Sequence, residues 1–275
     1  MKIKTIGIIG GRGKMGSWFA NFFAKEGIEV FISDVKKEKL PKRLKNPRIN
    51  FFQDNKELVK KVDFILISVL FKDFLKVVKE ISPLVKKEQK ILDILSIKEK
   101  PVEIMHSFFK KNITLGTHPL FGPKTKSTRH NFLLTPTNKK ERDFAKDFKE
   151  WLEKRNFRVK ILSPKEHDEF MTEILGFPHF VALVSGSTIL DFDKERLMNV
   201  LGPSFKKLLS LIKNVAFSSP EFYSDLHFHL PKIEEIEKKF EENVKKWNLI
   251  IKRKDKERFI QEMLKIRDFF QTNVG

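Results

Sequence analysis

The sequence predicts an α/β protein in which a doubly wound parallel sheet is followed by an all-helical domain. In the first half of the chain, short apolar runs alternate with amphipathic stretches, which is the pattern of strands joined by helical crossovers. After Ser163-Pro164 the hydrophobic pattern changes, and long helical patterns replace the strand-like runs. We therefore expect one domain over residues 1–163 and a helical domain over residues 164–275.

The first domain contains seven apolar runs that we interpret as strands. They cover residues 3–9, 28–33, 64–69, 90–95, 112–117, 131–135 and 157–162. Helical patterns lie at residues 14–27, 72–85 and 139–155. The first of these carries Trp18, Phe19, Phe22 and Phe23 on one side. Strands separated by helices in this way favour parallel pairing, because each crossover returns the chain to the same edge of the sheet.

The second domain is predicted to begin as a helix, because Ser163 is a favourable N-cap residue and Pro164 suits the first helical position. Two later segments repeat apolar residues at three- and four-residue steps, which is the spacing of one helix face. These residues are Ile233, Ile236, Phe240, Val244 and Trp247, and then Phe259, Met263, Ile266 and Phe270. We expect their apolar stripes to form core and subunit contacts.

The composition excludes some kinds of protein. The chain of 275 residues is 40% hydrophobic, enough for a substantial core, and it has no cysteine, which rules out disulfides and thiolate chemistry. Its longest apolar run, residues 64–71, suits a buried strand and is too short to span a membrane. No signal-peptide pattern follows the first lysines. We expect a cytoplasmic protein with no membrane partner.

The chain is strongly basic, with a net charge of +19 and a pI of about 9.8, as many nucleic-acid-binding proteins are. Here the lysines are spread along the chain and mixed with glutamates, as in residues 232–239, and lysine far outnumbers arginine. Base reading favours arginine. We interpret the charge as a solvated surface that attracts anionic substrates and cofactors, and we expect no nucleic-acid partner.

A nucleotide-binding motif lies between the first predicted strand and the first predicted helix. It is the Gly-x-Gly-x-x-Gly pattern formed by Gly11, Arg12, Gly13, Lys14, Met15 and Gly16. In this context Gly11 permits a tight turn, Gly13 lets the backbone approach a pyrophosphate, and Gly16 lets helix and strand pack closely. The helix N-terminus then faces the phosphates. These features predict a Rossmann-type dinucleotide-binding domain.

The residue expected to select the cofactor is Asp34, which ends the second predicted strand, 23 residues after Gly11. A carboxylate there accepts hydrogen bonds from a ribose 2′-hydroxyl and repels a 2′-phosphate, which favours NAD over NADP. Lys36 and Lys37 follow closely and could instead bind a phosphate. Arg12, inside the loop, could pair with the pyrophosphate or lie in solvent.

The segment Gly116-Thr-His-Pro-Leu-Phe-Gly-Pro123 places one histidine just after a predicted strand. The strand would end at the carboxyl edge of the sheet, where open α/β sheets bind their ligands. Pro119, Gly122 and Pro123 fix the backbone around His118. Since histidine titrates near neutral pH, we expect His118 to accept a proton from a substrate hydroxyl.

These motifs resemble those of the prephenate dehydrogenase family, which includes arogenate and cyclohexadienyl dehydrogenases. The resemblance extends over nearly the full chain and rests on residues 10–16, 93–98, 117–123, 166–168 and 177–180. The His-Pro-x-Phe-Gly-Pro segment is the most specific of them. The resemblance implies a Rossmann domain followed by a helical dimerisation domain, a homodimer, and NAD as cofactor.

The reaction implied by this resemblance is oxidative decarboxylation of prephenate to 4-hydroxyphenylpyruvate in tyrosine biosynthesis. His118 would accept the C4 hydroxyl proton while hydride passes from C4 to the nicotinamide and carbon dioxide leaves. Ser96 resembles the family serine that bridges this hydroxyl and the histidine, although it could also cap a helix beginning at Ile97. His179 resembles a substrate-pocket histidine, or is packed in its helix, and we interpret His167 as structural.

The match fails at an arginine that binds a substrate carboxylate in the family, six residues before a proline. If Pro220 is that proline, the arginine position is Asn214, which carries no charge. Lys213 beside it, and Arg129 in the loop after the histidine motif, are candidate replacements. This departure leaves the choice between prephenate and arogenate open.

Two other interpretations stay open. The chain could be a different NAD(P)-dependent dehydrogenase on the same scaffold, such as a β-hydroxyacid or imino-acid reductase, with Lys206 or Lys213 as a catalytic lysine. It could also be a cofactor-binding protein with weakened catalysis, of which Asn214 would be a sign. The sequence offers no spaced set of metal ligands, so we expect no metal.

Overall fold

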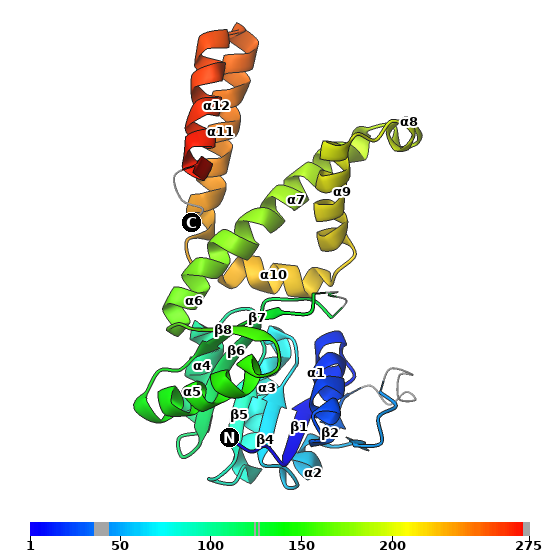
Figure 1. The fold of residues 1–275 in the computed structure, drawn as a ribbon, viewed down its shortest axis with the longest axis vertical. Helices are drawn as coiled ribbons and strands as arrows, with labels where there is room; N and C mark the ends of the chain where they lie inside the picture. Colours follow the sequence, from blue (N-terminus) through cyan, green and yellow to red (C-terminus); the bar gives the residue numbers. More distant parts are fainter. Residues whose placement is uncertain (36–43, 124, 126, 272–275) are drawn as a thin grey trace.

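The computed structural model describes residues 1–35, 44–123, 125 and 127–271. An eight-stranded sheet with helices on both faces forms the first part (Figure 1). Its strands are β1 (Thr5–Ile9), β2 (Glu29–Ser33), β3 (Ile49–Phe52), β4 (Phe64–Ile67), β5 (Lys90–Asp93), β6 (Ile113–Pro119), β7 (His130–Thr135) and β8 (Phe157–Ile161). Its helices are α1 (Lys14–Lys25), α2 (Asn55–Val59), α3 (Phe71–Ile81), the 3₁₀ turn η1 (Ser82–Leu84), α4 (Glu99–Phe108) and α5 (Lys139–Glu153).

The strand order is β3-β2-β1-β4-β5-β6-β7-β8, and its first six strands follow the order of a Rossmann sheet. All neighbours pair in parallel except β6 and β7, which are antiparallel. The prediction of a parallel sheet is wrong for this pair because the described residues between β6 and β7 form no crossover helix. The chain therefore turns back and enters β7 from the opposite end.

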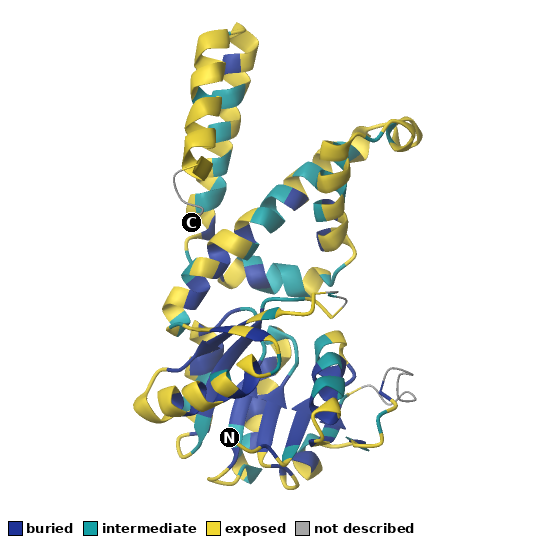
Figure 2. Ribbon diagram, viewed as in Figure 1, coloured by how far each residue is buried: buried dark blue, intermediate teal, exposed yellow. Residues whose placement is uncertain are grey.

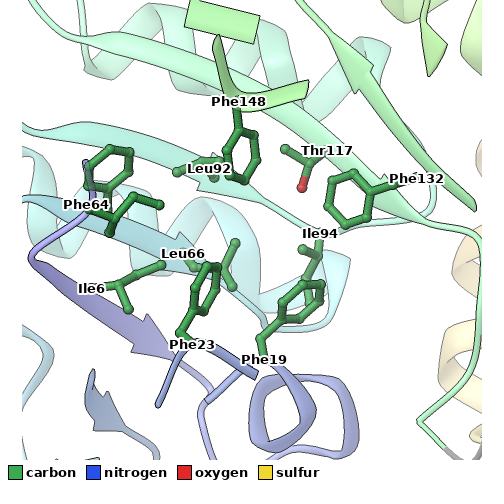
Figure 3. A pocket seen from close by; sticks show the side chains of 11 residues that line it. Ile6, Phe19, Phe23, Phe64, Leu66, Leu92, Ile94, Thr117, Phe132 and Phe148 are labelled. Carbon is green, nitrogen blue, oxygen red and sulfur yellow. The ribbon is translucent and has the colours of Figure 1, made fainter. Parts of the chain in front are cut away.

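Each face of the sheet has its own apolar core. Helices α1 and α5 cover the face that includes Ile8 and Leu66, whereas α2, α3 and α4 cover the face that includes Ile65 and Ile67. Figure 3 shows the first core, where phenylalanines from α1, α5 and β7 surround a cavity of about 10 Å³. Such a space is too small for a ligand. This face of the sheet is therefore packed core.

The second part of the chain is helical and begins with the predicted cap. The Ser163 hydroxyl accepts from the Glu166 backbone N–H, the Glu166 carboxylate accepts from the Ser163 N–H, and Pro164 takes the first helical position. Helix α6 (Pro164–Met171) continues through a π-helical turn (Thr172–Gly176) into α7 (Phe177–Thr188). The remaining elements are η3 (Ile189–Asp191), α8 (Lys194–Asn199), α9 (Pro203–Ala216), α10 (Pro220–His229), α11 (Ile233–Arg253) and α12 (Lys256–Gln271).

This helical part is open, with much of its surface exposed (Figure 2). The α11–α12 hairpin projects away from the sheet, while α6 and α10 lie next to it (Figure 1). The helix from Pro164 to Asp191 is long and apolar enough to cross a membrane, the one such helix in the described ranges. Only 11% of its most apolar window is buried. Most of its apolar surface is therefore exposed in the single chain.

Candidate active site

The glycine loop joins β1 to α1 against the end of β4. Gly10 has a φ of +80°, and a Cβ there would lie 2.3 Å from the Ser68 carbonyl oxygen, so only glycine fits. The Gly13 N–H donates to the Gly10 carbonyl oxygen at 3.0 Å, so the tight turn runs from Gly10 through Gly11 to Gly13, and Gly10 is the residue in it with a positive φ. A Cβ on Gly11 would meet Ile32 at 2.5 Å, and one on Gly16 would meet the Gly10 carbonyl oxygen at 2.3 Å. The loop and helix are thus in direct backbone contact.

The N-terminus of α1 is open to an anion. Gly13 is its N-cap and supplies no side-chain cap, and the first turn has no acidic residue. Gly13 and Lys14 are exposed and Met15 is half-buried. Because the first amides of a helix have no acceptor within it, this end presents N–H groups and partial positive charge to a phosphate.

Asp34 closes the loop from the end of β2. Its Oδ2 accepts a hydrogen bond from the Arg12 backbone N–H at 3.0 Å. Arg12 does not extend into solvent: it is 7% exposed, and its guanidinium carbon lies 5.5 Å from the centre of the Phe51 ring. Lys36 and Lys37 lie outside the described residues. The amide donors and the carboxylate are the groups that a dinucleotide requires at this place in a Rossmann sheet.

His118 and Pro119 are the last two residues of β6. The strand extends two residues further than predicted, because His118 pairs with Leu133 of β7 and Pro119 pairs with Phe132. The following loop is anchored by Phe121, whose ring centre lies 4.7 Å from that of Trp18 and 4.4 Å from that of His130. The backbone on both sides of the histidine is therefore held by packing.

The His118 imidazole belongs to a hydrogen-bonded chain that ends on a carboxylate. Nδ1 of His118 lies 2.9 Å from Nε2 of His167, and Nδ1 of His167 lies 2.7 Å from Oδ1 of Asp168. His118 is 4% exposed and His167 is fully buried. Nε2 of His118 makes no hydrogen bond to the described residues and is not among their fully enclosed unpartnered polar atoms. This nitrogen therefore keeps access to solvent.

Asp168 also joins the two parts of the molecule. Its Oδ1 accepts from the Lys98 backbone N–H at 2.7 Å, and its Oδ2 accepts from the Glu99 N–H at 2.9 Å. Asp168 thereby caps α4, which has no cap from its own N-cap residue. The expectation that Ser96 caps a helix beginning at Ile97 is wrong, because the helix begins at Glu99 and its acceptor comes from α6. Ser96 is half-buried between β5 and α4.

A buried ion pair lies beside these histidines. The Lys98 ammonium contacts Oδ1 of Asp93, and both side chains are fully buried. The Asp93 backbone carbonyl accepts from the Thr117 hydroxyl at 2.5 Å, which ties the pair to β6. Burial raises the pKa of Asp93 and lowers the pKa of Lys98, while their mutual attraction opposes both shifts.

Burial also favours the neutral form of both histidines. It lowers the pKa of His118 well below 6.5, and a proton on His167, followed by the charge of Lys98, would act in the same direction. Burial, with Lys98 second, lowers the pKa of His167 to about 2. A neutral imidazole has a free lone pair, so His118 can accept a proton at neutral pH.

His179 belongs to a second group of polar rings, between α7 and α10. Its ring centre lies 4.6 Å from that of Tyr223 and 6.3 Å from that of His227. Nδ1 of His179 and Nε2 of His227 are buried with no hydrogen-bond partner in the described part of the chain. Burial, followed by the charge of His227, lowers the pKa of His179 to about 4. Unpartnered buried nitrogens of this kind are suited to a polar ligand group.

The predicted carboxylate-binding residues lie on the surface. Lys213 and Asn214 are exposed near the end of α9, and Arg129 is exposed before β7. Within residues 1–35, 44–123, 125 and 127–271, no hydrogen bond or ion pair links any of these side chains to His118 or His179. The same ranges hold no group of three His, Asp or Glu residues that could bind a metal ion.

Sequence reasoning missed three residues of this arrangement. It treated His167 as structural and assigned no role to Asp168 or Tyr223. The sequence does mark these residues. His167 and Asp168 are adjacent in the Glu-His-Asp motif, and Tyr223 is the single tyrosine of the chain. The contact between His118 and His167 joins residues 49 positions apart, so no local pattern could reveal it.

Two family models match the chain. The nucleotide-binding domain of prephenate dehydrogenase matches residues 19–161, and the dimerization domain of prephenate dehydrogenase matches residues 163–265. The chain belongs to the prephenate dehydrogenase family. The resemblance seen in the motifs is thereby confirmed.

Relatives within this family differ in length from the chain. A probable arogenate/prephenate dehydrogenase of Methanocaldococcus jannaschii is 31% identical over 275 residues, which cover 98% of this chain and 62% of the relative. The T-protein of Haemophilus influenzae is 23% identical over 281 residues, which cover 98% of this chain and 67% of the relative. The chain thus spans less than two thirds of the M. jannaschii protein.

Solved structures share the whole fold. Prephenate dehydrogenase of Aquifex aeolicus, in complex with hydroxyphenyl propionate and NAD⁺, has a TM-score of 0.81 at 20% identity, and the match covers 98% of each chain. Synechocystis arogenate dehydrogenase has a TM-score of 0.72 at 16% identity, covering 97% of this chain and 99% of the other. The predicted fold class, a Rossmann-type domain followed by a helical domain, is confirmed.

Proposed function

We propose that this family member is an NAD-dependent enzyme that oxidatively decarboxylates prephenate to 4-hydroxyphenylpyruvate, with arogenate as the alternative substrate. The observation that carries the proposal is His118, a buried and neutral imidazole at the end of β6 whose Nε2 has no hydrogen-bond partner among the described residues. Such a nitrogen can accept a hydroxyl proton. The name of the M. jannaschii relative, arogenate/prephenate dehydrogenase, supports both substrates.

The proposed cofactor is NAD, which supplies the hydride acceptor when bound. The residues that would hold it are Gly11, Arg12, Gly13, Lys14, Met15 and Gly16 around the N-terminus of α1, together with Asp34. The glycines fit this role because a Cβ on Gly16 has no room, and the helix N-terminus is uncapped by any side chain. The carboxylate of Asp34 favours a ribose 2′-hydroxyl over a 2′-phosphate, so we propose that NADP binds more weakly.

His118 is proposed to hold and return one proton during the reaction. Its Nε2 takes the C4 hydroxyl proton as the C4–H bond breaks and hydride leaves. When the bond to the ring carboxylate breaks, carbon dioxide departs and the ring becomes aromatic. The proton then returns to the phenol oxygen, so the net change is one hydride transferred and one carbon dioxide released. Ser96, half-buried after β5, is proposed to bridge the hydroxyl and His118.

Substrate binding is assigned to the helical part. His179 is proposed to contact the substrate, since its Nδ1 is buried and unpartnered among the described residues. Because Asn214 carries no charge, we propose that a nearby cation replaces the family arginine. Lys213 and Arg129 are both exposed and can supply that charge, with less geometric control in the case of lysine.

The helical part is also proposed to form a homodimer. The family model for residues 163–265 describes a dimerization domain, and large apolar side chains are exposed on α7, α11 and α12. A second copy, rather than a lipid bilayer, is proposed to cover the apolar helix from Pro164 to Asp191. This arrangement agrees with a cytoplasmic enzyme.

Steady-state kinetics test the proposal, using NAD or NADP with prephenate, arogenate and simple β-hydroxy acids. We expect turnover with NAD and one of the first two substrates, and a loss of about 10²- to 10⁴-fold in kcat for His118→Asn. NAD binding, followed by fluorescence titration, should be unchanged in this variant. Turnover of β-hydroxy acids alone, or NAD binding without any turnover, would contradict the proposed function.

A further inference from the structure

The carboxylate of Asp168 determines the direction of the hydrogen bonds that lead to His118. Burial raises the pKa of Asp168, but backbone N–H groups of Glu99 and Lys98 donate to its two oxygens and oppose this shift by favouring the ionised form. The ionised carboxylate only accepts, so Nδ1 of His167 must donate to it at 2.7 Å. A neutral His167 then has a bare Nε2, which accepts the Nδ1–H of His118 at 2.9 Å. The lone pair of His118 is consequently on Nε2.

We propose that His167 and Asp168 are positioning residues that hold His118 in the tautomer protonated on Nδ1, and that they do so only while α6 is docked against α4. The kinetic consequence of this inference rests on the proposed function, in which Nε2 of His118 is the proton acceptor. The tautomer itself does not depend on that function.

The docking of α6 places the two positioning residues. His167 and Asp168 belong to the helical part, whereas His118 and the amides bound by Asp168 belong to the sheet part. A buried apolar cluster closes this junction. It consists of Ile97, Leu133, Met171, Leu226, Leu230 and Ile233. Leu133 is also the strand partner of His118, so the cluster excludes water next to the hydrogen-bonded chain and strengthens it.

The charges that face His118 and His167 support one tautomer and one charge state. From the segment between β5 and α4, Lys98 is paired with Asp93, and its charge disfavours a cation on either ring. From α6, Asp168 supplies the negative charge at the far end of the chain. When His118 takes a proton, the two hydrogen bonds orient both imidazoles toward this carboxylate, which compensates the new positive charge.

Two variants of His167 separate this role from simple packing. In His167→Gln, the amide nitrogen can donate to Asp168 and the amide oxygen can accept from Nδ1–H of His118. In His167→Leu, the volume is largely kept and the acceptor is lost. We expect His167→Leu to lower kcat by about 10²-fold or more, and His167→Gln to stay within about 10-fold of the natural enzyme. The KM for NAD should be unchanged in both.

NMR of the full chain with ¹⁵N-labelled histidine and NAD reads the tautomer directly. With His118→Asn used to assign the signals, we expect the natural protein and His167→Gln to carry the proton on Nδ1, and His167→Leu to show a mixture or the other tautomer. A proton on Nε2 in the natural protein would overturn the inference, and so would a His167→Leu variant with unchanged kcat and tautomer. If His167→Leu fails to fold, the ¹⁵N spectrum of the natural protein alone decides, because it shows which nitrogen of His118 carries the proton. Absence of turnover would defeat the proposed function and leave this test standing.

Discussion

The sheet part and the helical part bury their large side chains differently. Phe74 and Phe132, in the sheet part, are 0% and 2% exposed, whereas Phe217 and Phe228, in the helical part, are 80% and 82% exposed. Figure 2 shows the same contrast over the described residues, with buried segments concentrated in the sheet part. The sheet has helices on both faces and completes its own cores, but the long helices cover one another only in part. The helical part therefore leaves large apolar side chains exposed, which the proposed second copy would cover.

The hydrogen-bonded chain to His118 lies where these two parts meet. The proposed proton acceptor comes from the sheet part, and its proposed positioning residues come from the more exposed helical part. Weakening the helical part should therefore change catalysis, while damage to the sheet cores should unfold the molecule. The following predictions test this contrast.

The largest effect is expected in the sheet core. Phe74→Ala removes a fully buried ring from α3 and should lower the free energy of unfolding by about 3–5 kcal/mol. Urea unfolding measures the change. Phe217→Ala is the matched control and should cost less than about 0.5 kcal/mol unless a second copy covers it, in which case its cost depends on protein concentration. A loss below about 1 kcal/mol for Phe74→Ala would contradict a closed sheet core.

A comparable effect is expected on assembly. Met263 and Ile266 are exposed on α12, and replacing both with lysine should weaken a dimer by about 3 kcal/mol or more, since each buried apolar side chain contributes about 1.5–3 kcal/mol. Sedimentation velocity over a range of concentrations measures the shift. Leu75→Lys on α3, also an exposed apolar position, is the control and should leave the dimer intact. If Leu75→Lys weakened the dimer as much as the α12 variant, the proposed difference between the sheet part and the helical part would be contradicted.

The free energy of unfolding should fall as the pH drops below 6.5, before the carboxylates begin to take up protons. Burial lowers the pKa values of His118 and His167, so below pH 6.5 the unfolded chain binds protons that the folded one does not. Each histidine should then remove up to about 1.4 kcal/mol of unfolding free energy per pH unit as the pH falls. Stabilisation from His106 has the opposite sign: bonding to Glu141 raises its pKa, so this contribution is lost as the pH rises.

Urea unfolding between about pH 6.5 and pH 5 checks this slope. His167→Gln removes one of the buried rings that contribute to this slope while retaining hydrogen-bonding groups, and it should make the pH dependence of unfolding less steep. A slope that is identical in the natural protein and in His167→Gln would contradict the buried, neutral state of His167.

The smallest effect is expected at the substrate anchor. Lys213→Met removes an exposed charge next to Asn214 and should raise the KM for prephenate by about 5- to 10-fold, the size expected from about 1 kcal/mol of exposed ion pairing. Steady-state kinetics with varied prephenate measures it. Lys146→Met removes an exposed charge from α5, in the sheet part, and serves as control. If the control raises KM as much, general attraction by the basic surface explains the effect.

Local patterns were sufficient for most of the sheet, the glycine loop and the Ser163 cap, because each depends on residues close together in the chain. The four-residue strand β3 (Ile49–Phe52) was missed, since so short a run has little periodicity. The antiparallel pairing of β6 and β7 was also missed. This pairing follows from the connection between the two strands, whose described residues form no crossover helix, and not from the residues of either strand.

The site was less accessible to sequence reasoning. His118 could be singled out from its Pro/Gly-framed motif, but its connection to Asp168 depends on how α6 docks against α4. The cap of α4 likewise comes from a residue about 70 positions later, which no local rule for helix ends includes. The division at residue 163 and the roles of the cofactor- and substrate-binding residues stay predictions.

The central claim is that a buried, neutral His118 accepts the substrate proton. The pH dependence of kcat/KM in the free enzyme tests it most directly, because this quantity follows the ionisation of the essential base. Since burial lowers the pKa of His118, kcat/KM should rise with pH through one group whose midpoint lies below 6.5, and this limb should be absent from the residual activity of His118→Asn. A midpoint above 6.5, or the same limb in the variant, would contradict the account.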